Sequence, residues 1–161
     1  MSLIQPTSQP FKYTQVYKAY PPSMLPLRQP LVTGCYLNPF SGRFVFLASI
    51  TYRLALAGDA SIAGWVDEIN QGSSAGDDAA ICDDPNAIFE IPVSGVTLTA
   101  ANLLSTYQQA SFDLATTGSA LTLVQSVNLS GTSNKVVRIV GGNITRQTVF
   151  VKMNASKLQA I

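Results

Sequence analysis

Hydrophobic residues occur along most of the chain in short runs of strand length, separated by residues that favour turns. Runs of about four to eight apolar residues bounded by Gly, Pro, Asn or Asp are typical of β-strands. Most of these runs occupy positions 31–36, 43–48, 51–56, 79–82, 87–93, 112–114 and 121–129. We therefore expect a mainly β fold, a small β-barrel or β-sandwich with one short helix and an extended N-terminal arm.

The clearest hairpin lies near the end of the chain. Residues 135–140 and 144–153 are two hydrophobic segments joined by Gly141, Gly142 and Asn143, which predicts antiparallel strands with the turn at 141–143. Apolar residues alternate with other types in the second strand, so one of its faces should be buried. The residues expected on that face are Val149, Val151 and Met153.

One segment has the signals of a short helix. Thr99 is a favourable N-cap for a helix over residues 100–109. Leu98 before the cap and Leu103 in the first turn are spaced to contact each other as a hydrophobic staple. We expect this pair to set the angle at which the chain enters the helix.

The first part of the chain differs in composition, since seven of the nine prolines lie in the first forty residues. Proline fixes φ and lacks a backbone donor, so we divide the chain into an extended arm, 1–30, and a β domain, 31–161. Extended chain cannot bury aromatic side chains alone, so the arm lies on its own domain or on another subunit. Aromatic enrichment of interface cores favours another subunit. The candidate interface residues of the arm are Phe11, Lys12, Tyr13, Tyr17, Lys18, Tyr20, Met24, Leu25 and Arg28.

Charged residues are few and are segregated along the chain. They make up 12% of it, about half of what is usual for a globular domain. Segment 1–53 has five basic residues and no acid, segment 54–134 has nine acids and no base, and segment 135–161 has five bases and no acid. Either the basic ends fold back beside the acidic middle, or they contact a different, acidic partner.

The composition excludes the commonest catalytic arrangements. The chain has no histidine, so neither a Ser-His-Asp nor a Cys-His nucleophile is available. The acid pairs at 77–78 and 83–84 lack the spacing of a calcium loop, and solvated acidic loops explain them better. The uncharged stretches 91–112 and 114–134 are too polar to cross a membrane. We expect no catalytic residue, no metal site, no cofactor and no membrane partner.

Three single residues allow two interpretations each. Cys35 and Cys82 lie far apart with no metal spacing, which favours two buried thiols over a disulfide. Trp65 is the only tryptophan of the chain. Packing in the core is the default for such a residue, and a role as an interface anchor is the alternative.

The order of motifs in the last two thirds of the chain resembles a known family. The motifs are Ala-Gly-Trp-Val at 63–66, the strand at 87–94, the Thr-capped helix, and the segments 112–114, 123–129, 137–143 and 149–154. This order is similar to that of the small β-rich decoration, or cement, proteins of tailed-bacteriophage capsids; the proline-rich arm is outside the shared pattern. The resemblance implies a non-enzymatic protein that oligomerises, as a trimer by preference, on the major capsid protein and stabilises the shell.

The resulting hypothesis is a structural virion protein on the capsid surface, made in the host cytoplasm. The first alternative is a tail- or fibre-associated adhesin that binds a host glycan. The second is a barrel that binds single-stranded nucleic acid. The sequence does not favour nucleic acid as a partner, because the central predicted strands carry no Lys or Arg and no basic groove is evident.

Overall fold

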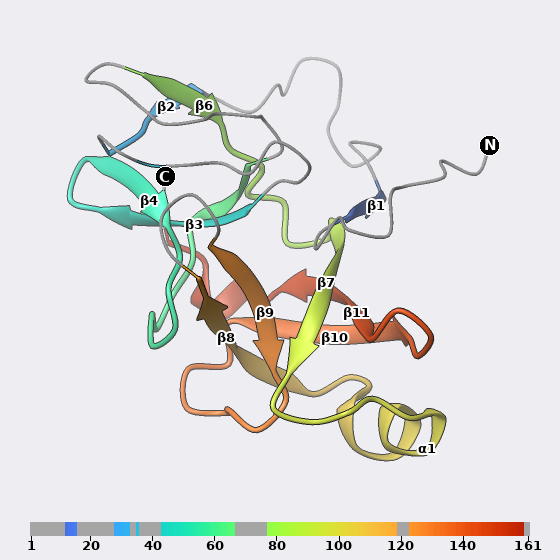
Figure 1. The fold of residues 1–161 in the computed structure, drawn as a ribbon. Coiled ribbons are helices and arrows are strands. Elements are labelled where there is room, and N and C mark those ends of the chain that lie inside the picture. Colours follow the sequence, from blue (N-terminus) through green and yellow to red (C-terminus); the bar gives the residue numbers. More distant parts are fainter. Residues whose placement is uncertain are drawn as a thin grey trace.

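The structure, a computed structural model, describes residues 12–15, 28–32, 35, 43–66, 77–118 and 123–159. Within them the chain is mainly β with one short helix, as the hydrophobic pattern predicts (Figure 1). Most of the predicted arm, including Phe11, Tyr17 and Tyr20, lies outside the described residues. The division into an arm, 1–30, and a domain, 31–161, stays a prediction.

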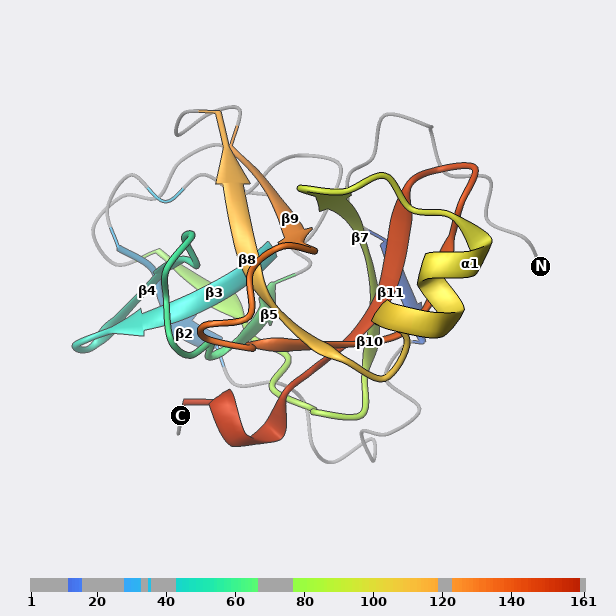
Figure 2. The same cartoon turned by 90° about the horizontal axis from the view of Figure 1, so that it is seen from below.

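The centre of the fold is a ring of five strands. The strands pair in the order β7-β11-β10-β8-β9, and β9 then pairs with β7 to close the ring (Figure 2). The closing pair is parallel and joins Val93 to Val127 and Ser94 to Asn128, whereas the other pairs are antiparallel. Closure leaves the barrel few unpaired strand edges. The strands are β7 (Ile88–Ser94), β8 (Ser111–Thr117), β9 (Val124–Asn128), β10 (Val137–Asn143) and β11 (Thr148–Met153).

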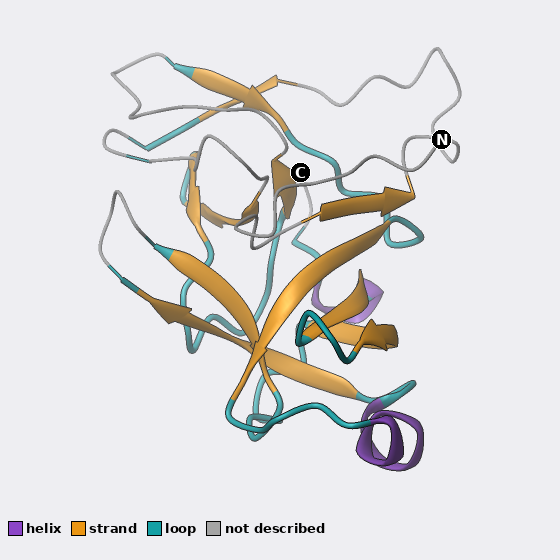
Figure 3. Cartoon of the chain, turned by 45° about the vertical axis from the view of Figure 1, so that its right-hand side comes forward, coloured by secondary structure: helices purple, strands orange, loops and turns teal. Residues whose placement is uncertain are grey.

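Two smaller sheets lie at one end of the barrel, opposite the helix (Figure 3). One has three strands in the order β4-β3-β5, and the other pairs β2 with β6. A further strand, β1, pairs with the first half of β7 outside the ring. The bounds are β1 (Lys12–Gln15), β2 (Arg28–Pro30), β3 (Arg43–Ala48), β4 (Thr51–Leu54), β5 (Gly64–Val66) and β6 (Asp78–Ala80).

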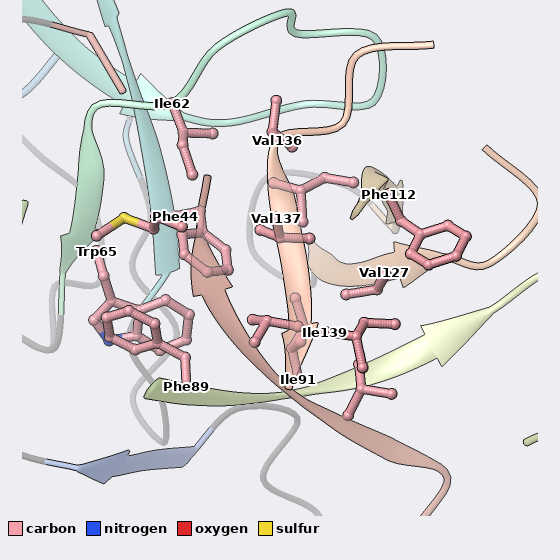
Figure 4. Close-up of a cluster of buried hydrophobic side chains, with 14 of the residues drawn as sticks. Phe44, Ile62, Trp65, Phe89, Ile91, Phe112, Val127, Val136, Val137 and Ile139 are labelled. Atoms are coloured by element: carbon pink, nitrogen blue, oxygen red, sulfur yellow. The ribbon is translucent and has the colours of Figure 1, made fainter. Parts of the chain in front are cut away.

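Three aromatic rings join the three-stranded sheet to the barrel (Figure 4). Trp65 of β5 stacks on Phe89 of β7 with ring centroids 4.5 Å apart, and Phe44 of β3 meets Trp65 edge-on at 4.7 Å. Each of the three residues is at most 1% exposed. Because burying one large apolar side chain contributes about 1.5–3 kcal/mol, this cluster is a principal stabilising contact between the two sheets.

Gly64 is required by close packing beside this cluster. A Cβ atom at residue 64 would lie 2.5 Å from the carbonyl oxygen of Cys82. The close approach lets Trp65 and Cys82 exchange two backbone hydrogen bonds of 2.8 and 2.9 Å. The glycine before the tryptophan therefore allows β5 to reach the segment that follows β6.

A buried glutamine makes the main polar contact between β9 and the β3–β4 hairpin. The side-chain oxygen of Gln125 accepts from the backbone N–H of Phe44 at 2.9 Å, and its nitrogen donates to the carbonyls of Phe44 and Ala55 at 2.8 Å each. Gln125 is fully buried. Its amide thus satisfies backbone groups that would otherwise be buried without partners, at a cost of about 1–3 kcal/mol each.

Two further glutamines make the same kind of contact. Gln147, in the β10–β11 turn, accepts from the N–H of Leu98 and donates to its carbonyl, at 2.7 and 2.9 Å. Gln159 likewise accepts from the N–H of Leu47 in β3 and donates to its carbonyl, at 2.7 and 3.1 Å. In each case a side-chain amide pairs with one residue of the backbone as a neighbouring strand would.

The predicted N-terminus of the helix is confirmed. Thr99 accepts from the backbone N–H of Asn102, and the Asn102 side chain accepts from the N–H of Thr99, which forms a capping box. Leu98 and Leu103 are both buried. The helical segment comprises α1 (Ala100–Asn102) and the π-helical turn η1 (Leu103–Tyr107), so it ends two residues before the predicted end. It ends there because Gln109 has a φ of 66° and its N–H bonds the carbonyl of Ile139 in β10.

The predicted position of the hairpin turn is wrong. Gly141 and Gly142 lie inside β10, and the chain reverses at residues 144–147. A Cβ at Gly142 would lie 3.2 Å from Leu98, and one at Gly141 would lie 3.3 Å from the ring of Phe150. The two glycines therefore make room for neighbouring side chains instead of forming a turn. The predicted burial of Val149, Val151 and Met153 is confirmed.

We predict that Gln125→Ala destabilises the protein by about 3 kcal/mol, because it removes three hydrogen bonds and leaves buried backbone groups unsatisfied. Urea denaturation measures the change in free energy of unfolding. Gln108→Ala is the matched control, since Gln108 is exposed at the end of the helix. Equal stability of the two variants would show that the Gln125 amide does not hold the sheets together.

Candidate functional site

The described parts of the predicted arm pair with the chain's own sheets. β1 is antiparallel to β7 and places Lys12 opposite Glu90 and Tyr13 opposite Phe89. β2 places Arg28 opposite Ala80 of β6. These two segments therefore add strands to sheets of their own chain. The composition had favoured contact with another subunit instead. Contact of the arm with another subunit stays a prediction for its other candidate residues, which lie outside the described residues: Phe11, Tyr17, Lys18, Tyr20, Met24 and Leu25.

Trp65 is a core residue in this structure. Its side chain is 1% exposed and packs between Phe44 and Phe89. A ring buried in this way has no surface left for a partner. The structure therefore supports the interpretation of Trp65 as a core residue. It does not support the alternative, that Trp65 is an interface anchor.

The most polar buried contact of the barrel is at Glu90 of β7, whose side chain is 3% exposed. One carboxylate oxygen, Oε1, accepts from the Thr148 hydroxyl at 2.7 Å and pairs with the Arg146 guanidinium at 2.6 Å. Among the described residues, the second oxygen, Oε2, has no hydrogen-bond partner. Arg146 and Thr148 both belong to the β10–β11 hairpin, so the carboxylate links this hairpin to β7.

Both ion pairs that the structure gives for the described residues join a basic flank of the chain to its acidic middle. Arg146 pairs with Glu90, and Arg53 pairs with Asp59 through two hydrogen bonds of 2.8 and 2.9 Å. The bonds to Asp59 raise the pKa of Arg53, against the effect of partial burial. Arg53 also lies 4.3 Å above the ring of Phe46. The Arg146–Glu90 pair agrees with the first interpretation of the charge pattern, basic ends folded beside the acidic middle, whereas Arg53 and Asp59 are only six residues apart in the chain.

Two of the described acids accept hydrogen bonds from backbone N–H groups. Asp84 accepts from the backbone N–H of Asn86, and Asp113 accepts from three successive backbone N–H groups, residues 133–135. Within the described residues, no group of three His, Cys, Asp or Glu side chains is placed to hold a metal ion. No helix in the same part of the chain is long and apolar enough to cross a membrane.

The two cysteines are buried thiols, as the sequence favours. Burial raises the pKa of the Cys35 thiol, and a hydrogen bond with the backbone of Leu54 opposes this shift only in part. A buried thiol with a raised pKa is a poor nucleophile, since the thiolate is the reactive form. Burial also raises the pKa of the Tyr52 phenol, with a smaller contribution from the charge of Asp83.

One end of the molecule exposes large apolar side chains. We call this the apolar end and define it by Val96, Leu104 and Ile144, which are 37%, 71% and 39% exposed. They come from the loop after β7, from the helix and from the β10–β11 turn, and the Gln147 amide holds that loop and that turn together. The sequence analysis missed this surface. The sequence feature that could have predicted this surface is the adjacent pair Leu103 and Leu104, because a helix this short can bury only one of two adjacent leucines.

Comparisons with protein-family models, with curated proteins and with solved structures found no match to this chain.

We predict that the protein loses stability as the pH rises above about 8.5, where thiols and then phenols of the unfolded chain ionise. The folded state keeps Cys35 and Tyr52 protonated to a higher pH, because their folded-state pKa values are raised. Their stabilising contribution is therefore complete below the unfolded-state pKa and is lost as the pH passes the folded-state value. Urea denaturation from pH 7 to 10 measures this slope, which should be shallower in Cys35→Ala. An unchanged slope in that variant would contradict the assignment to Cys35.

Proposed function

We propose that the chain is a structural component of a virus particle, a decoration protein that oligomerises on the outer surface of a capsid and stabilises the shell. The observation that carries the proposal is the apolar end, where Leu104, Ile144 and Val96 are 71%, 39% and 37% exposed at the same end of the molecule. Large apolar side chains gathered on a surface mark sites of protein contact. The low content of charged residues agrees with a chain that buries much of its surface against neighbouring subunits.

The way β1 binds β7 supports an assembling role. A short strand from a proline-rich segment adds to the outer edge of β7 through backbone pairing. Strand addition at a sheet edge is also a common way for an extended segment of one chain to bind another. The arm of a neighbouring copy can therefore bind this edge in place of the chain's own β1, with Tyr17, Tyr20 and the other candidate residues of the arm adding contact area.

The test of this function has two steps. The size of the purified protein in solution, measured by light scattering, should be that of an oligomer. The protein should then co-sediment with purified capsid shells that lack it and should raise the temperature at which the shells open. A monomer that neither sediments with shells nor changes their stability would exclude the proposal.

We predict that Leu104→Asp weakens oligomer formation or shell binding by about tenfold or more, because it places a charge in an apolar interface. The melting temperature of the isolated protein should stay within a few degrees of the original, since this side chain is already solvated. Thr106→Asp is the control, an exposed residue of the same helix that receives the same charge. If both variants assemble like the original protein, the apolar end is not an interface.

A further inference from the structure

Four basic residues lie at the open end of the β10–β11 hairpin, away from its turn. We call them the cationic face and define it by Lys135, Arg138, Lys152 and Lys157. Arg138 and Lys152 are direct partners in the register of β10 and β11, and Lys135 precedes β10. Lys157 ends the short helix η2 (Ala155–Lys157), which follows β11. The side chain of Asn154, the N-cap of η2, bonds the carbonyl of Lys135, so the two basic segments are held together.

The side chains of this face point away from the core. Val137 and Ile139 on either side of Arg138 are buried, and so are Val151 and Met153 on either side of Lys152. Successive residues of a strand point to opposite faces, which places Arg138 and Lys152 on the outer one. Arg138 and Lys135 are exposed, and Lys152 and Lys157 are half-buried.

These charges are not neutralised within the described part of the chain. No ion pair there joins any of the four to an acid, in contrast to Arg53 and Arg146. Asp113 is hydrogen-bonded to the backbone next to Lys135, but its carboxylate accepts from three backbone N–H groups and pairs with none of the four cations. Arg138 donates from Nε to the carbonyl of Gln109 at 3.3 Å, which leaves its outer nitrogens for other acceptors. Like charges directly opposite each other in a sheet are destabilising, so the Arg138–Lys152 pair lowers the stability of the free chain.

The surroundings of the face favour carboxylates over nucleic acid as the bound group. Single-stranded nucleic acid binds where bases can stack on exposed aromatic rings. The aromatic residue nearest in sequence on the outer face is Phe150, whose half-buried ring lies over Gly141. Tyr107 and Phe112 are buried.

We propose that the cationic face is a docking surface for an acidic protein surface, with carboxylates of the partner placed between Arg138 and Lys152. The inference rests on the proposed function only for the partner's identity, an acidic region of the capsid shell. Binding would remove the repulsion within the face and orient the protein with this end of the hairpin against its partner.

The test uses the full chain and soluble poly-L-glutamate as the acidic probe. The original protein should bind it at low ionic strength and progressively less as salt is added. The double variant Arg138→Gln, Lys152→Gln should bind at least about fivefold more weakly. Each single variant should melt at the same temperature as the original protein or higher, because it relieves the repulsion. A clear fall in melting temperature would show that the two cations serve the fold instead.

The control is Thr97→Glu, Ala100→Glu, which changes the net charge by the same two units at exposed positions near the turn end of the hairpin. It should bind the probe within about twofold of the original protein, since its charges lie away from the face. Equal losses in the two double variants would mean that net charge alone controls binding. Tighter binding to a single-stranded oligo-dT than to poly-L-glutamate would overturn the choice of an acidic protein.

Sedimentation with capsid shells separates this inference from the proposed function. If the face binds the probe but no form of the protein sediments with shells, the proposed function fails and the docking surface stands. If the shells bind the original protein and the Arg138→Gln, Lys152→Gln variant equally, the docking inference fails and the proposed function stands.

Discussion

The arrangement of the fold depends on the amide of Gln125. It joins β9 of the barrel to two backbone segments of the β3–β4 hairpin in a fully buried position. The aromatic cluster of Phe44, Trp65 and Phe89 forms around the same hairpin, because the bonded backbone of Phe44 sets where its ring lies. Apolar burial supplies most of the free energy of this contact, but it is not directional. The hydrogen bonds of the amide determine the position of one sheet on the other.

Neutral amides make several of the polar tertiary contacts for which many proteins use charges. Gln147 and Gln159 repeat the arrangement of Gln125 at the helix and at the end of the chain. An uncharged amide loses less hydration free energy on burial than an ion does, so the low content of charged residues is compatible with a well-defined interior. Among the described charges, Arg53–Asp59 and Arg146–Glu90 form ion pairs, Asp84 and Asp113 accept from backbone N–H groups, and four basic residues form the cationic face.

The β10–β11 hairpin has different surfaces at its two ends. Ile144 lies in the turn and belongs to the apolar end, whereas Arg138 and Lys152 lie at the open end of the hairpin. An assembling protein needs at least two contact surfaces, one for other copies of itself and one for the structure it covers. In the proposed assembly, this hairpin separates the two contact surfaces, and the barrel holds them apart.

The sequence by itself determined the β class, the positions of most strands, the helix cap at Thr99 and the buried face of β11. These depend on neighbouring residues, through alternation, capping and turn preferences. The ring closure between β7 and β9, the contacts of the three glutamines and the cationic face depend on residues far apart in the chain, so only the tertiary structure decided them. Gly141 and Gly142 show the difference. Their local sequence predicts a turn, but both residues lie inside β10. There the absence of a side chain leaves room for Leu98 and Phe150, which pack closely against them.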